Sequence, residues 1–296
     1  MTLATMSNNI LKLCPGLNPD IIKSNLQDSY RQLCSKDWSR LKLMRQIPTA
    51  AIYSTGTVSV SAAGVVTVAG GGVFTSAMVG RFMKVYYDDS FFEIAFYSAP
   101  NVTLRSWPGD IVAAQTYSIF QTIYTVDPLF GQVFDVTYQT PLIKRSQSYF
   151  NKIDPSRTGT STTPIFWAFA GLNSVGSIQI EIYPVPTSVI SLRVDGKLKA
   201  STLGDSDIPY LPEDLIEALA LINCYRQKEL QDPKAGWAER AASQIDPENP
   251  SGYPALLNMY FDEDYELDAR TQRVRDVTEE PLIPSDDNFA LSHDVE

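Results

Sequence analysis

The clearest alternation of apolar and polar positions lies between Tyr183 and Glu229, in the stretch YPVPTSVISLRVDGKLKASTLGDSDIPYLPEDLIEALALINCYRQKE. Within it, Ile190–Val194 alternates apolar with polar residues, and this period of two predicts a half-buried strand. Pro212, Glu213 and Asp214 are typical of a helix N-terminus, because proline needs no amide partner there and acids suit the helix dipole. Apolar residues then recur every three or four positions, which predicts a helix packed on more than one side: Leu215, Ile216, Leu219, Ile222 and Tyr225.

A second helical pattern begins at Asn18, a good N-cap, followed by Pro19 for the first turn and Asp20 for the dipole. Its apolar positions continue to about Met44. We expect this helix to end before Pro48, because the residue that precedes a proline avoids helical angles. The apolar stripe of the predicted helix comprises Ile22, Leu26, Tyr30, Leu33 and Leu41, with Trp38 close to it.

Residues 49–124 differ in character, since they are rich in Val, Thr, Ser, Tyr and Gly and poor in helix formers. Short β-type segments alternate there with turn signals such as Gly70-Gly71-Gly72, a spacing typical of a small antiparallel barrel or sandwich. The predicted strands are Ala50–Tyr53, Thr57–Ser61, Val65–Val68, Phe82–Tyr87, Phe91–Tyr97, Val102–Arg105 and Tyr117–Ile123.

The run GGVFTSAMVGRF, from Gly71 to Phe82, interrupts these strands. We expect Phe74, Met78 and Val79 to fill the barrel, with Gly80 at a tight corner that only glycine adopts without strain. The triple glycine is not read as a phosphate loop, because neither a Lys-Ser/Thr pair nor a helix follows it.

Residues 125–204 continue in β style and form a second predicted β-region. The polar run at Ser156–Thr163 is expected to be an exposed loop. Pro184 and Pro186 place the end of the strand before them at a sheet margin, since proline lacks the amide that a ladder needs. The predicted strands here are Gln132–Gln139, Thr163–Phe169, Ser177–Tyr183 and Ser188–Val194.

The C-terminal part is predicted to be helical again. After a helix over Pro212–Gln231, we expect Asp232 to cap a further helix with Pro233 in its first turn, and another helix within Gly252–Tyr265. The fold class is therefore predicted as α+β: a helical bundle from N- and C-terminal helices with a large inserted antiparallel β-region. The predicted domains are a helical core (1–48 and 205–261), a small β-barrel module (49–124), a second β-region (125–204) and an acidic arm (262–296).

Charge is concentrated in the arm. The chain of 296 residues has a net charge of −10, and residues 262–296 contain 12 acidic against 3 basic side chains. High charge with low hydrophobicity predicts that this arm is disordered alone and becomes ordered on a partner. The body is nearly neutral, so we do not expect it to grip nucleic-acid phosphates. The sequence contains no apolar run long enough to predict a membrane span, nor the pattern of a signal peptide.

Residues suited to catalysis or metal binding are scarce. His293 is the only histidine, and Cys14, Cys34 and Cys224 are too far apart for a metal cluster, so we expect buried free thiols, no metal and no cofactor. Pairs of carboxylates remain as candidates for glycosidase chemistry. They are Asp88, Asp89 and Glu93 in one region and Asp205 and Asp207 in another. All lie in turn-like settings, where we expect Asp205 and Asp207 to shape a loop; the chain is not predicted to be an enzyme.

Two strings resemble tailed-phage proteins: YPVP followed by DSDIPYLPE, and FTSAMVGR at Phe74–Arg81. The first resembles the strand–loop–helix end of head-to-tail connector (adaptor) proteins, and the second a β-module of phage structural proteins. The resemblance implies a virion structural protein, assembled in the host cytoplasm, that forms a ring of usually twelve copies in the neck of the particle. Such a ring docks under the portal, receives the tail tube or nozzle, and lets DNA pass without binding it specifically. The implied portal or neighbour interface comprises Tyr260, Phe261, Tyr265, Leu267, Phe289 and Leu291.

Two alternatives stay open at this point. A fibre-attachment or glycan-binding tail subunit would use the β-module to present Trp107 and Tyr97 to sugar rings. A tail glycan hydrolase would use Asp88 or Glu93 as its catalytic carboxylates.

Overall fold

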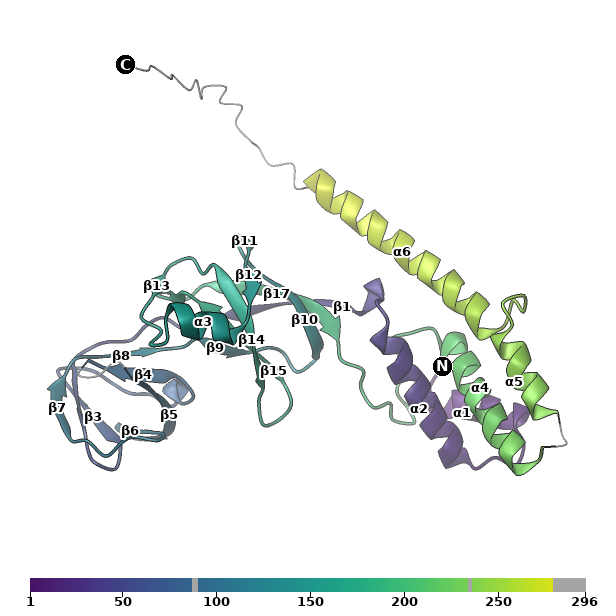
Figure 1. Ribbon diagram of the computed structural model, residues 1–296, viewed down its shortest axis with the longest axis horizontal. Helices are drawn as coiled ribbons and strands as arrows, with labels where there is room; N and C mark the ends of the chain where they lie inside the picture. Colours follow the sequence, from purple (N-terminus) through teal and green to yellow (C-terminus); the bar gives the residue numbers. More distant parts are fainter. Residues whose placement is uncertain (87–89, 234–235, 279–296) are drawn as a thin grey trace, which may run out of the picture. The chain divides into compact units, whose positions relative to one another are not determined.

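The computed structural model describes residues 1–86, 90–233 and 236–278, and in 266–278 it describes the backbone alone. The described chain is α+β, with six α-helices and an antiparallel half-barrel sheet among its strands, as predicted (Figure 1). It divides into two compact units, Met1–Arg40 with Ser201–Glu296, and Leu41–Ala200. None of the described helices combines the length and apolar character that a membrane-spanning helix needs.

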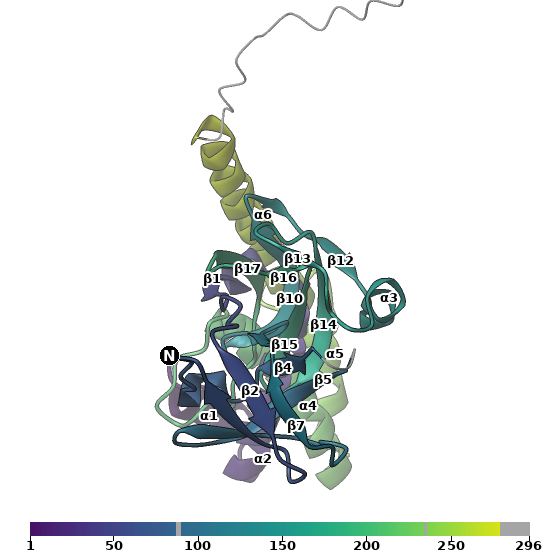
Figure 2. The ribbon, with the colours of Figure 1, turned by 90° about the vertical axis from the view of Figure 1, so that its left-hand side faces the viewer.

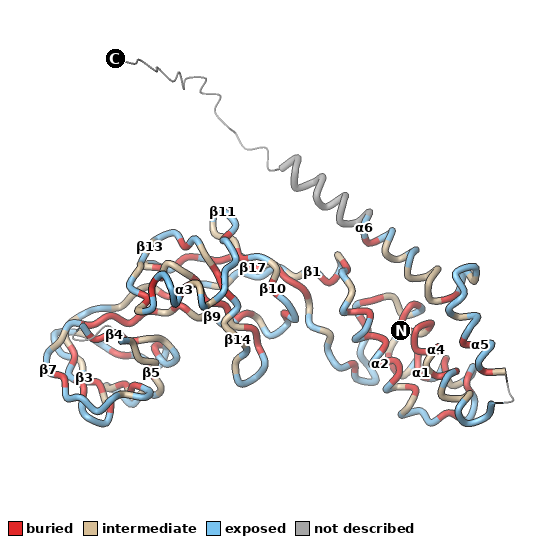
Figure 3. Tube along the Cα trace, viewed as in Figure 1, coloured by how far each residue is buried: buried red, intermediate tan, exposed pale blue. Residues whose placement is uncertain are grey.

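The first unit, called here the helical unit, contains α1 (Leu3–Leu13), α2 (Pro19–Ser35), α4 (Glu213–Gln231), α5 (Trp237–Ile245) and α6 (Tyr253–Thr278). Asn18 caps α2 by accepting a hydrogen bond from the amide of Asp20, as its sequence predicts. Helix α2 packs against both α1 and α4, and buried positions lie along all three helices (Figure 3). All five apolar positions predicted for α4 are buried.

Helix α2 ends earlier than predicted. It stops at Ser35, and residues that were expected to be helical as far as Met44 instead form a 3-10 turn, η1 (Ser39–Leu41), and strand β1 (Lys42–Pro48). The Trp38 indole donates to the carbonyl of Leu33 at 2.9 Å, which satisfies one of the open carbonyls of the last turn. Strand β1 pairs antiparallel with β17 (Ser191–Leu198) over its whole length, so long-range pairing overrides local helix propensity.

The helix after α4 also starts later than predicted. Asp232 does not cap a new helix; its amide bonds to the carbonyl of Lys228 and closes α4. Pro233 therefore follows a helix end, a common place for proline. Helix α5 begins at Trp237 after Gly236, whose positive φ of 70° suits glycine. Helix α6 confirms the helix expected within Gly252–Tyr265 and continues to Thr278, into the first part of the predicted acidic arm.

The second unit, called here the β unit, begins with the half-barrel. Its seven strands form one curved sheet in the order β7-β2-β3-β6-β5-β4-β8 (Figures 1 and 2). Four strands coincide closely with predicted segments, while Ala50–Tyr53 forms only an isolated bridge, Tyr53 to Ile119. The strands are β2 (Thr57–Val60), β3 (Val65–Ala69), β4 (Phe82–Val85), β5 (Phe91–Ser98), β6 (Asn101–Leu104), β7 (Val112–Gln115) and β8 (Tyr117–Phe120).

The run that precedes β4 fills the half-barrel in part as predicted. Phe74 is 1% exposed and Met78, in the 3-10 turn η2 (Ser76–Met78), is buried, so both join the core of the sheet. Gly80 has a φ of 81°, which confirms the tight corner. Val79 is 43% exposed, so its predicted place in the core is wrong, because it immediately follows the turn and points outward.

The rest of the β unit consists of smaller sheets around a second apolar core. One has the order β1-β17-β10-β11, one the order β12-β14-β15-β9, and β13 pairs with β16. Within β17, Leu192 and Val194 are fully buried and Ser191 is exposed, so the predicted alternation is confirmed. The remaining elements are β9 (Ile123–Thr125), β10 (Phe130–Tyr138), β11 (Thr140–Pro141), β12 (Ile143–Arg145), α3 (Gln147–Ile153), β13 (Thr160–Ser161), β14 (Phe166–Leu172), β15 (Ile178–Tyr183) and β16 (Val185–Pro186).

Candidate functional site

Among the residues predicted to contact a partner, the structure describes the side chains of Tyr260, Phe261 and Tyr265. Phe261 stacks on Trp38 with ring centroids 4.2 Å apart, and the Tyr260 hydroxyl donates to Asp214 at 2.7 Å. Tyr265 is 76% exposed. Leu267 lies where only the backbone is described, and Phe289 and Leu291 lie outside the described residues. Tyr260 and Phe261 thus already make contacts within the helical unit, and their part in a partner interface stays a prediction.

Asp264 holds α6 to the η1 turn, which follows α2. Its carboxylate accepts hydrogen bonds from the backbone amides of Ser39 and Arg40, the latter at 3.1 Å, and from the Arg40 guanidinium at 3.1 Å. The side chain is 3% exposed, so these bonds are made largely out of water. Both amides begin the η1 turn, where donors have no partner within the turn itself. The carboxylate therefore caps η1 and fixes the point at which α6 leaves the body of the unit.

Tyr260 and Phe261 complete this attachment, called here the α6 anchor (Trp38, Arg40, Tyr260, Phe261 and Asp264). Burial, followed by the hydrogen bond to Asp214, raises the pKa of Tyr260 to about 12. The hydroxyl therefore stays protonated at neutral pH and remains a donor. Asp214 lies in the first turn of α4, so the anchor joins α6 to two helices.

The carboxylates considered for catalysis are occupied with structural contacts. Glu93 pairs with Arg105 at 3.5 Å, and Asp205 pairs with Lys23 at 2.7 Å. Asp207 accepts from the amide of Gly204 at 2.7 Å, which confirms its role in shaping the loop before α4. Asp88 and Asp89 lie outside the described residues, as does His293. Within the described residues, no cluster of His, Cys, Asp and Glu has the grouping that a metal ion requires.

The three cysteines are free and buried, as expected. Burial raises the pKa of the Cys14 thiol to about 12 and also raises that of Cys224. A nucleophilic cysteine needs the opposite shift, because the thiolate is the reactive form.

The aromatic residues suggested for sugar binding are largely used by the half-barrel. Trp107 packs edge-on against Phe92 with centroids 4.8 Å apart, and its indole donates to the carbonyl of Asp110 at 2.8 Å. Tyr97 is half-buried against the same core. A sugar platform needs an open aromatic face, and both rings are partly buried against the half-barrel.

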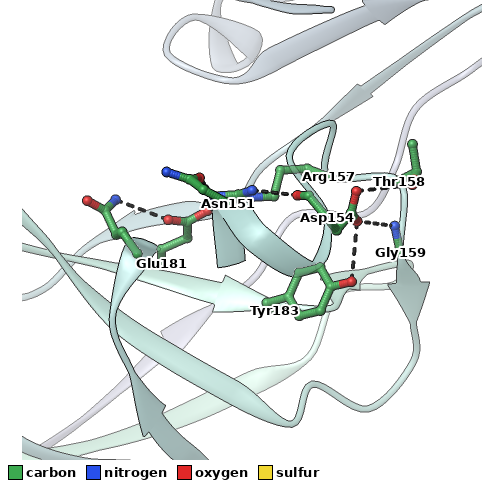
Figure 4. Close-up of polar contacts among 8 residues, drawn as sticks. Asn151, Asp154, Arg157, Thr158, Gly159, Glu181 and Tyr183 are labelled. Carbon is green, nitrogen blue, oxygen red and sulfur yellow. Dashed lines mark hydrogen bonds and ion pairs between the residues drawn. The ribbon is translucent and has the colours of Figure 1, made fainter. Parts of the chain in front are cut away.

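A buried ionic cluster in the β unit was missed by the sequence analysis. Arg157 donates from Nε to Glu181 at 2.7 Å, and its terminal nitrogens donate to the Asp154 carbonyl at 2.6 Å and to Asn151 at 2.7 Å (Figure 4). The Arg157 and Glu181 side chains are 6% and 5% exposed. The predicted exposed loop at Ser156–Thr163 is therefore wrong at Arg157, which is drawn inward by Glu181 of β15.

Asp154 closes the other side of this cluster (Figure 4). Its carboxylate accepts from the Gly159 amide at 2.7 Å and from the hydroxyls of Thr158 and Tyr183 at 3.2 and 3.3 Å. Burial alone raises the pKa of this carboxyl, but the hydrogen bonds from Gly159, Thr158 and Tyr183 outweigh burial and lower the pKa below its ordinary value. Asp154 thus favours its charged form in the fold.

An Asp154→Asn variant is expected to be less stable than wild type at pH 7 and to approach wild type as the pH falls below about 4. The stabilisation from a depressed pKa is present above the ordinary carboxyl pKa and is lost as protons bind the folded state. Urea unfolding of both proteins from pH 7 to pH 3 measures the difference. A gap between the two that stays constant over this range contradicts the assignment.

A weak signal for the cluster existed in the sequence. Glu181 stands alone among apolar neighbours in β15, between Ile180 and Ile182, and a buried acid in such a strand requires a cation. The sequence does not say which cation, because Arg157 is 24 residues away from Glu181 along the chain. The cluster connects α3 and the loop after it to β15 through hydrogen bonds and an ion pair. The charged groups of Asp154, Arg157 and Glu181 each contact a partner.

The structure therefore contains two well-built polar sites, the α6 anchor and the Arg157 cluster, and both hold elements together. Their geometry suits stable shape more than bond-making, since the carboxylates are saturated by donors. No protein-family model matches this chain, and comparison with curated proteins finds no significant match.

Proposed function

We propose that this protein is a virion structural subunit, a head-to-tail adaptor that forms a ring between portal and tail through which DNA passes. The support from sequence is the resemblance of YPVP…DSDIPYLPE and FTSAMVGR to phage structural proteins. In this proposal the helices of the helical unit form a bundle that builds the ring wall, and the β unit faces a neighbouring component. The ring stands in the neck of the particle and is usually of twelve copies.

The α6 anchor is the observation that carries the proposal. An arm that is to clamp a second assembly must leave its own subunit in a defined direction, and Asp264 sets that direction by capping η1. Immediately after the anchor, Tyr265 is 76% exposed. Exposed tyrosines next to a rigid support are typical of interface hot spots. In the proposal, Tyr265 and the acidic residues beyond it contact the portal or a neighbouring subunit.

The division of charge supports side-by-side assembly. Between residues 41 and 200 the chain has 12 Lys and Arg against 9 Asp and Glu, whereas the remainder has 12 against 25. The β unit is therefore slightly basic and the helical unit strongly acidic. In a ring with head-to-tail contacts, unlike surfaces meet at every interface, and unlike charge favours that contact over self-pairing of like surfaces.

Native mass spectrometry tests the proposal directly. We expect the full-length chain, mixed with the portal protein from the same particle, to give a species whose mass is the portal ring plus several copies of this chain. A Tyr265→Ser variant is expected to weaken this complex at least ten-fold. Its matched control is Met259→Ser, since Met259 is also exposed on α6, at 44%, but precedes the anchor.

Two outcomes would count against the adaptor. One is a chain that stays monomeric in the presence of portal rings. The other is electron-microscopic density for the protein at the periphery of the tail instead of the portal–tail joint, which favours the fibre-attachment alternative.

A further inference from the structure

A pocket of about 250 Å³ lies in the β unit where β10 meets β12, β14 and β15. Its apolar walls include Phe169, Leu172 and Ile178, and its polar features are Lys144 and Trp167. Small-molecule sites usually have volumes of about 300–1,000 Å³. This pocket is smaller, and its volume suits one large side chain better than a cofactor. Such pockets typically receive an anchor residue from a macromolecule.

Exposed apolar residues lie at this pocket and in the turn of the hairpin that lines it. Phe169 is 54% exposed, Leu172 is 60% exposed, and Val175 in the turn that joins β14 to β15 is 79% exposed. Single exposed apolar residues are normal on a protein surface. Several of them grouped on one hairpin instead indicate a surface that another chain covers.

Two polar features, the Trp167 indole N–H and the Lys144 ammonium, belong to the lining of the pocket. The Trp167 side chain is 1% exposed, yet its indole N–H has no hydrogen-bond partner among the described residues. Leaving a buried donor unpaired costs about 1–3 kcal/mol, and an oxygen brought by an occupant is the simplest remedy. The ammonium of Lys144 lies 4.9 Å from the Trp167 ring centroid. Lys199 adds a second exposed cation, since its Cα lies beside Gly131 of the same pocket.

These features specify an occupant that is acidic and carries an apolar anchor. Residues 279–296 of this chain have that composition, with six acidic residues, no Lys or Arg, and Phe289 and Leu291 at a spacing of two. In an extended segment that spacing places both side chains on one side. Asp286 and Asp287 precede them and Asp294 follows, so carboxylates flank the anchors on both sides.

We propose that the pocket between β10 and the β14–β15 hairpin receives residues 279–296 of a second copy of this chain, with Phe289 or Leu291 as the anchor and Lys144 paired to a flanking carboxylate. The proposal rests on the proposed function in one respect, that copies stand side by side. It goes further by naming the receptor: the β unit of one copy holds the acidic segment of the next.

The test is peptide binding in solution, without portal protein. A fluorescein-labelled peptide of residues 279–296 is titrated with the full-length chain in which Phe289→Ser and Leu291→Ser disable its own segment. Fluorescence anisotropy measures the affinity. We expect Leu172→Asp and Lys144→Glu, each added to that chain, to weaken binding at least ten-fold. The matched controls are Ile111→Asp and Lys152→Glu, which make the same changes at exposed positions of the β unit away from the pocket.

Three results would overturn the proposal. The first is that the peptide does not bind, and the second is that the pocket variants and the control variants bind it equally well. The third is that a scrambled peptide of the same composition binds as tightly as the native one. The last would show attraction by charge alone. Circular dichroism confirms that each variant is folded. If Leu172→Asp does not fold, the peptide affinity of Lys144→Glu, which leaves the apolar core intact, decides between the outcomes. Failure here leaves the portal mass measurement untouched, so the two proposals fail separately.

Discussion

An Arg157→Met variant will unfold about 3–5 kcal/mol more readily than wild type, because it leaves Glu181 as a buried carboxylate without a cation. Glu181 would retain only the amide of Gln147, at 3.0 Å, as a side-chain donor. The change also removes the bond from Arg157 to Asn151 of α3, so fewer contacts hold that helix to β15. Urea unfolding, together with hydrogen exchange of the β15 amides, measures the loss.

Removing both charges separates the cost of an unpaired ion from the value of the pair. We expect the double variant Arg157→Met with Glu181→Leu to be more stable than either single variant, since no uncompensated charge then remains. The matched control is the exposed pair Arg105–Glu93, with side chains 62% and 35% exposed. Its removal is expected to cost less than about 1 kcal/mol. Equal losses at the buried and exposed pairs would contradict the role assigned to burial.

Replacing Asp264 by alanine is expected to cost about 2–4 kcal/mol and to release the start of α6 from the helical unit. The amides of Ser39 and Arg40 and the Arg40 guanidinium would all lose their acceptor. The stacking of Phe261 on Trp38 and the hydrogen bond from Tyr260 to Asp214 would then remain. Hydrogen exchange of residues 253–265 and limited proteolysis measure the release.

Asp262 provides the control for this change. It lies two residues earlier on α6 and is exposed, so Asp262→Ala removes the same charge without a buried contact. We expect its exchange rates to match wild type. If the two variants behave alike, Asp264 does not anchor the helix. If Asp264→Ala releases α6 yet portal binding is unchanged, the direction of the arm is unimportant to assembly.

The α6 anchor and the Arg157 cluster share one design. Each uses a buried carboxylate that accepts from a guanidinium, Asp264 from Arg40 and Glu181 from Arg157, and each fixes an element that carries an exposed surface. Asp264 fixes the helix that presents Tyr265. The Arg157 cluster fixes β15, one strand of the hairpin that lines the proposed receptor pocket. Rigid support of a contact surface lowers the entropy lost when a partner binds.

Local pattern alone predicted much of the secondary structure. The apolar stripe of α4, the alternation in β17 and the N-cap at Asn18 depend on residues close in sequence, and the structure confirms all three. The short strands of the half-barrel were likewise predictable, because their turns are marked by glycine and proline. The α+β class follows from these elements without knowledge of how they pack.

Strand β1 shows where local pattern is ambiguous. Leu43 and Ile47 lie four residues apart, a spacing that fits one face of a helix and also one face of a strand. Both pack against the second core of the β unit, and their strand pairs with β17, about 150 residues later in the chain. Only that partner decides between the two readings, and its position is a property of the whole fold.

The polar sites were beyond the sequence for the same reason. Nothing near Arg157 indicates that Glu181 will meet it, and nothing near Asp264 indicates that the amides of residues 39 and 40 will need an acceptor. A charged residue in a polar run is usually solvated, so local composition predicts that such a side chain is exposed. The sequence by itself determined most of the helices and strands, those whose pattern is local, and where acidity gathers. Only the tertiary structure decided which charges leave water, because that depends on partners brought together from distant parts of the chain.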